Sequence, residues 1–238
     1  MKYERWVAFS DSHGDMMHKP SVDAALAFVK DFKPTVRIHM GDVFDFRWLR
    51  RFASEDEKLE QVTSDFQKGC WLLEQFKPTV FLWGNHDQRI KDAQDSNAGH
   101  GALKALADDW IGHIEDITPK CLHLPYDKRR GVHQYGDTKF LHGYCHGLAC
   151  GRRTALVYGK SCMGHVHRSD TVTVERHDRP TCYVSGCLCE LDMDYNRANL
   201  GTLAQEQGWL YGIKTSKGTV IVCHARRIDG KWYTPDNF

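Results

Sequence analysis

The sequence contains five short apolar segments, each followed within two residues by aspartate, asparagine or histidine. The clearest is residues 79–83, which run into Gly84-Asn85-His86-Asp87. Short apolar runs bounded by turn residues predict buried strands, and open α/β sheets bind ligands where such strands end. An asparagine oxygen can ligate a metal, a histidine can donate a proton, and an aspartate can orient that histidine. Taken alone, these four residues fit a capped turn as well as a functional site.

Asp11 and His13 follow the first predicted strand, and Asp42 follows the second. Residues two apart on an extended chain point the same way, which suits two ligands of one ion, although a polar turn is the alternative. A helical apolar stripe separates the strands, so the order predicts a βαβ unit with its carboxylates at one edge of a parallel sheet. The predicted elements are a strand at residues 6–9, a helix at 21–32 and a strand at 35–40.

Two histidine segments come later. His142 ends the second arm of a predicted hairpin and competes for a site position with His146, whereas His165 and His167 again lie two apart after a strand. A chance pair is the alternative for these last two. The other predicted elements are helices at 54–76, 106–111 and 151–159, the hairpin strands 132–135 and 138–141, and strands at 121–124, 160–163, 171–175, 182–185, 209–215 and 219–226.

The composition limits the partners and the cellular compartment that we expect for the protein. Lys and Arg (32) nearly equal Asp and Glu (31), so no overall field draws the protein onto nucleic acid or an anionic membrane. Nine cysteines without a CxxC pair indicate reduced thiols, and no apolar run could span a bilayer. We therefore expect a cytoplasmic protein of a cell or a virus, with no membrane partner. No linker divides the chain, which predicts a single domain over residues 1–238.

The ordered set resembles the signature of the calcineurin-like metallophosphoesterase superfamily, with no ligand position substituted. The resemblance implies an α/β fold, a four-layer αββα sandwich of two mixed sheets flanked by helices, with a dinuclear metal site at a sheet edge. The blocks that carry it are Asp11-x-His13, Gly41-Asp42-x-x-Asp45, Gly84-Asn85-His86-Asp87, His142, and Gly164-His165-x-His167.

The resemblance also implies the roles of these residues. Asp42 would bridge two ions, and a water held between them would become the attacking hydroxide. His86, backed by Asp87, would contact the phosphoryl oxygen and could protonate the leaving group, while Asp45 would orient a ligand or His86. Nitrogen and oxygen ligands accept Mn, Fe, Zn, Ni or Co, and we expect Mn²⁺ in vitro. One ion would be held by Asp11, His13 and His167, and the other by Asn85, His142 and His165.

The substrate is less constrained than the metal site. A chain of 238 residues leaves little room for a cap, so we expect an open cleft that hydrolyses phosphodiesters, including nucleotide-like ones, and phosphomonoesters more weakly. Arg89, Arg47 and His146 are the candidate substrate contacts, although solvated or ion-paired arginines are the alternative. The rival functions are a phosphomonoesterase or protein phosphatase, a nuclease subunit that binds nucleic acid through a partner, and a non-catalytic scaffold. The oligomeric state is left open.

Overall fold

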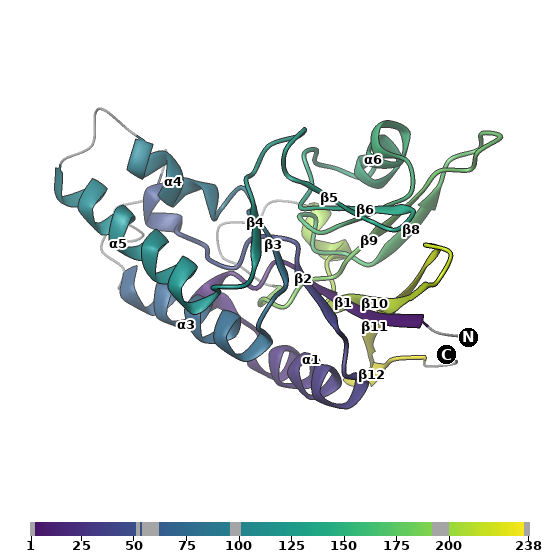
Figure 1. Ribbon diagram of the computed structural model, residues 1–238, viewed down its shortest axis with the longest axis horizontal. Coiled ribbons are helices and arrows are strands. Elements are labelled where there is room, and N and C mark those ends of the chain that lie inside the picture. Colours follow the sequence, from purple (N-terminus) through teal and green to yellow (C-terminus); the bar gives the residue numbers. More distant parts are fainter. Residues whose placement is uncertain (1–2, 51–52, 54–61, 96–100, 192–199, 236–238) are drawn as a thin grey trace.

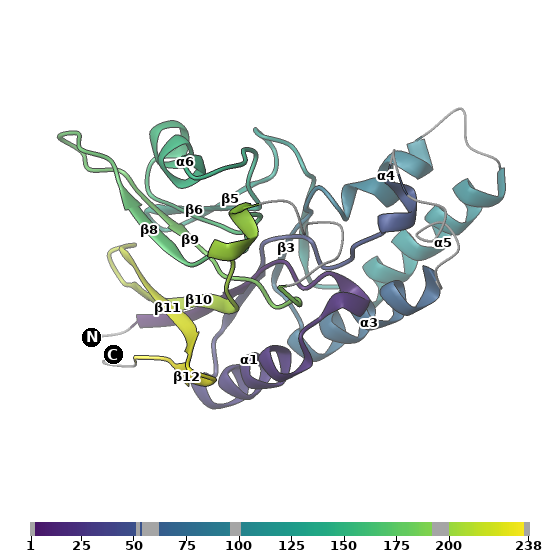
Figure 2. The same ribbon diagram turned by 180° about the vertical axis from the view of Figure 1, so that it is seen from behind.

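The computed structural model describes residues 3–50, 53, 62–95, 101–191 and 200–235. Two β-sheets pack face to face, and helices lie on the outer side of each sheet (Figure 1). This is the arrangement of two mixed sheets flanked by helices that the sequence predicted. The view from behind shows the same layers, with the longest helices gathered at one end of the molecule (Figure 2).

The first sheet combines parallel and antiparallel strands. Its four early strands are parallel to one another, and the three C-terminal strands join them antiparallel through β1. The parallel pairing follows from the helical crossovers between the early strands. In spatial order the strands are β12 (Lys231–Tyr233), β11 (Val220–Ile228), β10 (Gly208–Thr215), β1 (Tyr3–Phe9), β2 (Val36–His39), β3 (Val80–Leu82) and β4 (Leu122–Leu124).

The second sheet is smaller and also mixed. Its three central strands are parallel, and an antiparallel strand closes each edge. The hairpin predicted around Gly136 and Asp137 joins its first two strands, as expected. In spatial order the strands are β5 (Val132–Tyr135), β6 (Thr138–Leu141), β7 (Ser161–Met163), β9 (Thr181–Val184) and β8 (Asp170–Thr173).

Helices cover the outer face of each sheet. Two of them pack on the first sheet and one on the second, and the other two extend the helical end seen in Figure 2. The helix predicted over residues 54–76 is present from Val62 onward, and its predicted start at 54–61 lies outside the described residues. The helices are α1 (Lys19–Phe32), α3 (Val62–Phe76), α4 (Gln88–Asp95), α5 (Gly101–Ile117) and α6 (Cys150–Tyr158), with short 3₁₀ turns at Gly14–Met16, Arg47–Leu49 and Leu200–Ala204.

Strand β1 is buried on both faces. Successive side chains of a strand alternate between faces, so Trp6 points to the second sheet while Phe9 points to the helices. Trp6 meets Phe140 of β6 edge to face at 5.1 Å, and Phe9 stacks on Phe76 of α3 at 4.1 Å. Both contacts fix the level at which β1 ends, and they therefore fix where the polar residues after it emerge.

The parallel strands bring their carboxyl ends to one edge of the sandwich. β1, β2 and β3 of the first sheet and β6 and β7 of the second each end there. Each of the five polar blocks begins within a few residues of one of these ends. The topology therefore collects side chains that are far apart in the sequence.

Candidate metal centre

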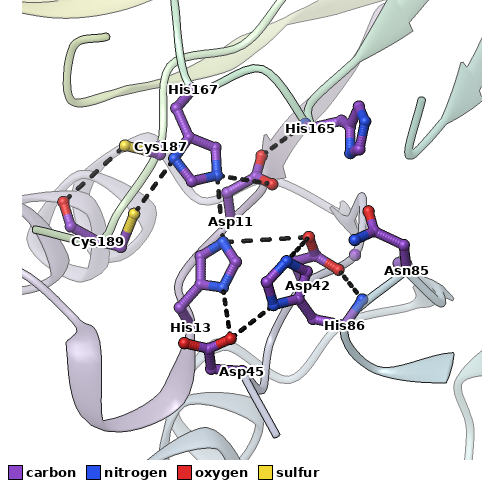
Figure 3. A network of polar contacts seen from close by, with 12 residues as sticks. Asp11, His13, Asp42, Asp45, Asn85, His86, His165, His167, Cys187 and Cys189 are labelled. Carbon is purple, nitrogen blue, oxygen red and sulfur yellow. Dashed lines mark hydrogen bonds and ion pairs between the residues drawn. The ribbon is translucent and has the colours of Figure 1, made fainter. Parts of the chain in front are cut away.

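The first half of the cluster is formed by residues that follow β1 and β7. The Nε2 atoms of His13 and His167 are 3.1 Å apart, and Oδ1 of Asp11 lies 3.4 Å from Nε2 of His167 (Figure 3). Asp11 and His13 are fully buried, and His167 is nearly so. Three donor atoms of the kinds that hold divalent ions thus converge in a protected position.

The second half is formed by residues that follow β2, β3, β6 and β7. Nε2 of His142 lies 3.0 Å from Oδ1 of Asn85, 3.2 Å from Nδ1 of His165 and 3.3 Å from Oδ2 of Asp42. The same Asp42 oxygen is 4.0 Å from Nε2 of His13. One carboxylate therefore lies next to both halves, which is the position of a bridging ligand.

The residues present fit a pair of divalent cations. Nδ1 of His142 donates a hydrogen bond to the Met40 carbonyl at 2.8 Å, so in the neutral ring Nε2 carries a lone pair. That lone pair faces the Asn85 carbonyl oxygen and the Asp42 carboxylate, which are acceptors too. Oδ1 of Asp11 is buried without a hydrogen-bond partner among the described residues. Lone pairs that converge in this way are matched by a cation.

The charges of the cluster separate the histidines into two kinds. Burial lowers the pKa of His13 to about 4 and, with the nearby His142, that of His165 to about 3. Burial opposes the charged form of His142 and His167 as well, but Asp42 raises the pKa of His142 to about 9 and Asp11 does the same for His167. One histidine of each half therefore holds a proton at neutral pH that a metal ion would displace.

The backbone of the cluster is strained. Several of its residues have a positive φ, which side chains other than glycine rarely adopt. Such strain persists where the surroundings over-determine it, and it gathers at functional sites. The residues are Asp11, His13, Asp42, His165 and His167, with φ between 52° and 73°.

Two glycines allow the blocks to approach one another. A Cβ on Gly84 would lie 2.1 Å from Oδ1 of Asp42, and one on Gly164 would lie 1.7 Å from Oγ of Ser10. The Asp42 carboxylate also accepts the backbone N–H of His86 at 2.8 Å. Gly84 is therefore required because Asp42 packs directly against the turn that carries Asn85.

His86 is oriented by Asp45, not by Asp87. Nδ1 of His86 is 2.6 Å from Oδ1 of Asp45, so the ring donates from Nδ1 and turns Nε2 toward the Asp42 carboxylate (Figure 3). Asp45 is held in turn by Arg89, which donates to its carbonyl at 2.7 Å and lies 3.4 Å from its carboxylate. The expectation that Asp87 backs His86 is wrong, and the alternative that Asp45 orients His86 is what the contacts show.

Asp87 joins two of the loops instead. Its carboxylate accepts the backbone N–H groups of Asp42 at 2.7 Å, Phe44 at 2.9 Å and Gly84 at 2.9 Å. It is fully buried and makes no described contact with the His86 ring. Asp87 therefore fixes the position of Asp42 relative to the Asn85 turn.

Two residues that support the cluster were not predicted. Asp65 of α3 accepts the backbone N–H groups of Asp45 at 3.0 Å and Phe46 at 2.7 Å, so it holds the loop that carries Asp45. Sγ of Cys189 lies 3.7 Å from Nδ1 of His167, on the opposite side of the ring from the cluster. Asp65 sits inside a helical pattern and Cys189 belongs to no motif, so neither carried a signal in the sequence.

A cavity of about 290 Å³ opens in front of the cluster. His86, His146 and Arg168 are among the residues that line it, and Nδ1 of His146 lies 3.1 Å from Nε2 of His165. Neither Arg47 nor Arg89 lines this cavity. Arg47 makes paired contacts with the Asp15 carboxylate at 2.8 and 2.9 Å, so both arginines predicted to bind substrate are engaged with carboxylates instead.

Three further observations concern residues outside the cluster. Trp48 packs edge to face on Trp110 of α5. All nine cysteines are free thiols. None of the helices in the described ranges combines the length and apolar character needed to cross a lipid bilayer.

The fold and the cluster define a class: an α/β protein with two stacked sheets and a set of metal ligands at one sheet edge. Comparison with known proteins agrees. A family described as calcineurin-like phosphoesterase matches residues 5–181. The chain belongs to this family, whose members use a dinuclear metal site, and this membership supports a metal-dependent phosphoric ester hydrolase.

Solved structures share the fold at low sequence identity. A single mutant of Vps29 from Entamoeba histolytica is 9% identical, with 96% of each chain covered and a TM-score of 0.51. A hypothetical protein from Pyrococcus horikoshii OT3 is 13% identical, with 95% of this chain and 88% of that chain covered and a TM-score of 0.51. A metallophosphoesterase from Sphaerobacter thermophilus is 12% identical, with coverage of 94% and 88% and a TM-score of 0.49. No curated protein matches the sequence.

Proposed function

We propose that the protein hydrolyses phosphodiesters, with weaker action on phosphomonoesters. The observation that carries this proposal is the cavity in front of the cluster, whose lining includes both His86 and Arg168. Phosphorus placed beside the cluster would have room for an ester group in the remaining space. The family supports phosphoester hydrolysis, and the shape and charge of this cavity support the diester.

The residues of the cluster would have different roles in hydrolysis. Asp11, His13 and His167 would hold one divalent ion, Asn85, His142 and His165 the other, and Asp42 both. Bound there, the two ions, for which we propose Mn²⁺ in vitro, would polarise the phosphoryl group and lower the pKa of water at the site.

His86 lies on the cavity side of the cluster. Its Nδ1 proton is committed to Asp45, so Nε2 is the atom that can meet the substrate. Nε2 is 4.0 Å from Oδ2 of Asp42, which sets it beside the place where phosphorus would sit. A proton held at Nε2 can be given to the departing oxygen, which is a general-acid role.

The charge of the cavity favours a diester over a monoester. Arg168 is the single Lys or Arg among the described residues that line it, and two backbone carbonyls already take hydrogen bonds from its guanidinium. A monoester brings two negative charges at neutral pH and a diester brings one. With few cations beyond the metal site, the second charge would be poorly matched.

A turnover comparison tests the proposal. The protein reloaded with Mn²⁺ should show a higher kcat/KM for bis(p-nitrophenyl) phosphate than for p-nitrophenyl phosphate at one pH. A tenfold or greater preference for the monoester would identify a phosphatase and overturn the diester assignment. His142→Ala should abolish turnover, whereas His177→Ala, at an exposed histidine, is the matched control.

Nucleic acid is one source of phosphodiesters that we include in the proposal. The net charge of +1 gives no general attraction to a polyanion, so a nucleic acid would have to be recognised locally, at the cavity. Binding of single- and double-stranded DNA measured against salt concentration separates the two cases. Tight binding with a steep salt dependence would favour a nuclease, and weak binding with turnover of small diesters would favour an esterase.

A further inference from the structure

Part of the cavity wall is formed by residues that are not metal ligands. This part of the wall includes residues 146–148, Arg168, which directly follows His167, and Gly201 and Gln205. His86 and several of the candidate metal ligands line the same cavity. A substrate that places phosphorus beside the cluster would therefore extend its second ester group toward Arg168.

The guanidinium of Arg168 is held in a fixed position. Its Nη2 donates to the Leu148 carbonyl at 2.9 Å and to the Gly147 carbonyl at 3.4 Å, and its Nε lies 4.0 Å from the Asp170 carboxylate. The side chain is 12% exposed, and its two hydrogen bonds to backbone carbonyls both come from Nη2. A planar cation is thus fixed at the border of the cavity with donor capacity to spare.

Leu148 adds an apolar side chain to this part of the cavity wall. Its side chain is 79% exposed although it borders the cavity and its backbone carbonyl is tied to Arg168. A single exposed leucine on a protein surface needs no explanation. Here, however, the leucine carbonyl accepts a hydrogen bond from a fixed guanidinium and the residue lines a polar cavity, where a bound group would cover its side chain.

We propose that this part of the cavity binds a planar aromatic group that is esterified to the reacting phosphorus. This is the ester group that stays on phosphorus when the other ester group leaves. The proposal rests on the phosphodiesterase function above and names its substrate class. A guanidinium stacks on aromatic faces, and leucine supplies apolar contact to a ring. A volume of about 290 Å³ is at the small end for ligand sites, so a phosphoryl group with one ring occupies it.

The test uses two diesters that differ in the retained group alone. Phenyl p-nitrophenyl phosphate and methyl p-nitrophenyl phosphate both lose p-nitrophenolate as water adds to phosphorus, so the chemistry of the leaving group is constant. The Mn²⁺-loaded protein should show a kcat/KM about tenfold higher for the phenyl ester, the size expected from covering one ring. Most of the difference should lie in KM, because ring contacts are similar in ground and transition states.

Three variants locate the effect. Leu148→Ser and Arg168→Met should each reduce the phenyl-to-methyl ratio of kcat/KM at least threefold, since each removes part of the ring surface. Val157→Ser changes an apolar side chain of α6 that is 72% exposed and does not border the cavity, and it should leave the ratio unchanged. Arg168 also holds the neighbouring loop through two hydrogen bonds. If Arg168→Met misfolds for this reason, the result for Leu148→Ser decides the test.

A binding measurement gives a readout independent of turnover. Isothermal titration of the Mn²⁺-loaded protein with phenylphosphonate and with methylphosphonate should show tighter binding of the phenyl compound, and Leu148→Ser should remove most of that difference. A phenyl-to-methyl ratio near one in the native protein overturns the aromatic site while diester hydrolysis stands. A large ratio that neither Leu148→Ser nor Arg168→Met lowers also overturns it. Failure to hydrolyse either diester overturns the proposed function and, with it, this proposal.

Discussion

The Nδ1 atom of His86 lies 2.6 Å from Oδ1 of Asp45, a residue 41 positions earlier in the chain. The two come from loops after different strands of the first sheet, β3 and β2. Because Nδ1 is committed to the carboxylate, the protein selects one orientation of the ring and presents Nε2 to the cavity. The orientation of the His86 ring is therefore controlled by a carboxylate that does not itself line the cavity.

Asp45→Asn should lower turnover and leave the metals in place. The amide keeps the size of the side chain but removes the charge that favours the donating Nδ1 of His86. Loss of a hydrogen-bonded carboxylate behind a functional histidine costs about 10- to 100-fold in activity. We expect this loss in kcat for phosphodiester turnover, with two ions per chain retained in elemental analysis. Asp178→Asn, in an exposed ion pair, is the control and should behave as the native protein.

His86→Ala should lose about 10²- to 10⁴-fold in kcat with fold and metal content intact, the usual contribution of a positioned proton donor. The loss should be smaller for a p-nitrophenolate leaving group, which needs little protonation, than for an alkoxide. Rates for the two kinds of ester, measured with the same metal and pH, check this. Equal losses for both would indicate that His86 acts on a phosphoryl oxygen and not on the leaving group.

The convergence of the candidate metal ligands could be predicted because each lies just after a strand. An apolar run followed by Asp-x-His or His-x-His predicts both a buried strand and a pair of polar side chains at its end. The topology then brings the five ends together, since parallel strands in both sheets finish at one edge. Local sequence and topology favoured these positions, and the resemblance to the family assigned them to two ions.

The partner of His86 could not be predicted in the same way. Asp45 and Asp87 are both near the motif blocks, and the choice between them depends on how the loop after Asp42 turns. Asp42 and Phe46 both adopt a positive φ, and this pair of turns brings Asp45 beneath the imidazole. Asp87, adjacent in sequence, is drawn away by three backbone N–H groups.

The supporting residues were missed because they are distant in the sequence. Arg168 is the exception, since it follows His167 directly, yet nothing in its neighbours showed that it would turn toward residues 147 and 148. Asp65 contacts a loop 20 positions earlier, and Cys189 contacts a histidine 22 positions earlier. Single polar residues inside helices or loops have no period that marks them, so only tertiary packing shows what they do.

Asp65→Ala should destabilise the fold. It would leave the buried backbone N–H groups of Asp45 and Phe46 without their acceptor, and an unsatisfied buried donor costs about 1–3 kcal/mol. The free energy of unfolding of the metal-free protein, from urea denaturation, should fall by at least that amount. Gln67→Ala, at an exposed position of the same helix, should change it little. If the two variants are equally stable, the Asp65 contacts contribute nothing to the fold.

The two halves of the cluster should respond differently to single substitutions. Asp42→Asn alters the carboxylate that lies next to both halves, so we expect metal content after dialysis to fall from two ions per chain to less than one. His167→Ala alters the first half alone and should retain about one ion, held by the second half. Elemental analysis of the saturated proteins distinguishes these results. A native protein that saturates with one ion while fully active would contradict the two-ion site.

The number of protons released on metal binding should depend on the protonation states of the four histidines in the cluster. The pKa of His142 and that of His167 are raised to about 9, so both rings are protonated at pH 7.5 in the metal-free protein. The pKa values of His13 and His165 are lowered to about 4 and 3, so these rings are already neutral. Each ion must therefore displace about one proton, from His167 in the first half and from His142 in the second.

Because the proton competes with the metal, affinity should fall as the pH falls. Below pH 9 the apparent dissociation constant of each ion should rise about tenfold for each pH unit, since one proton is bound for each ion released. Calorimetric titration with Mn²⁺ in two non-coordinating buffers of different ionisation enthalpy gives the number of protons directly. We expect about two per chain at pH 7.5 and clearly fewer at pH 10. Proton release that stays near zero at pH 7.5 would mean that His142 and His167 are neutral before the metal binds, and that Asp42 and Asp11 do not hold them charged.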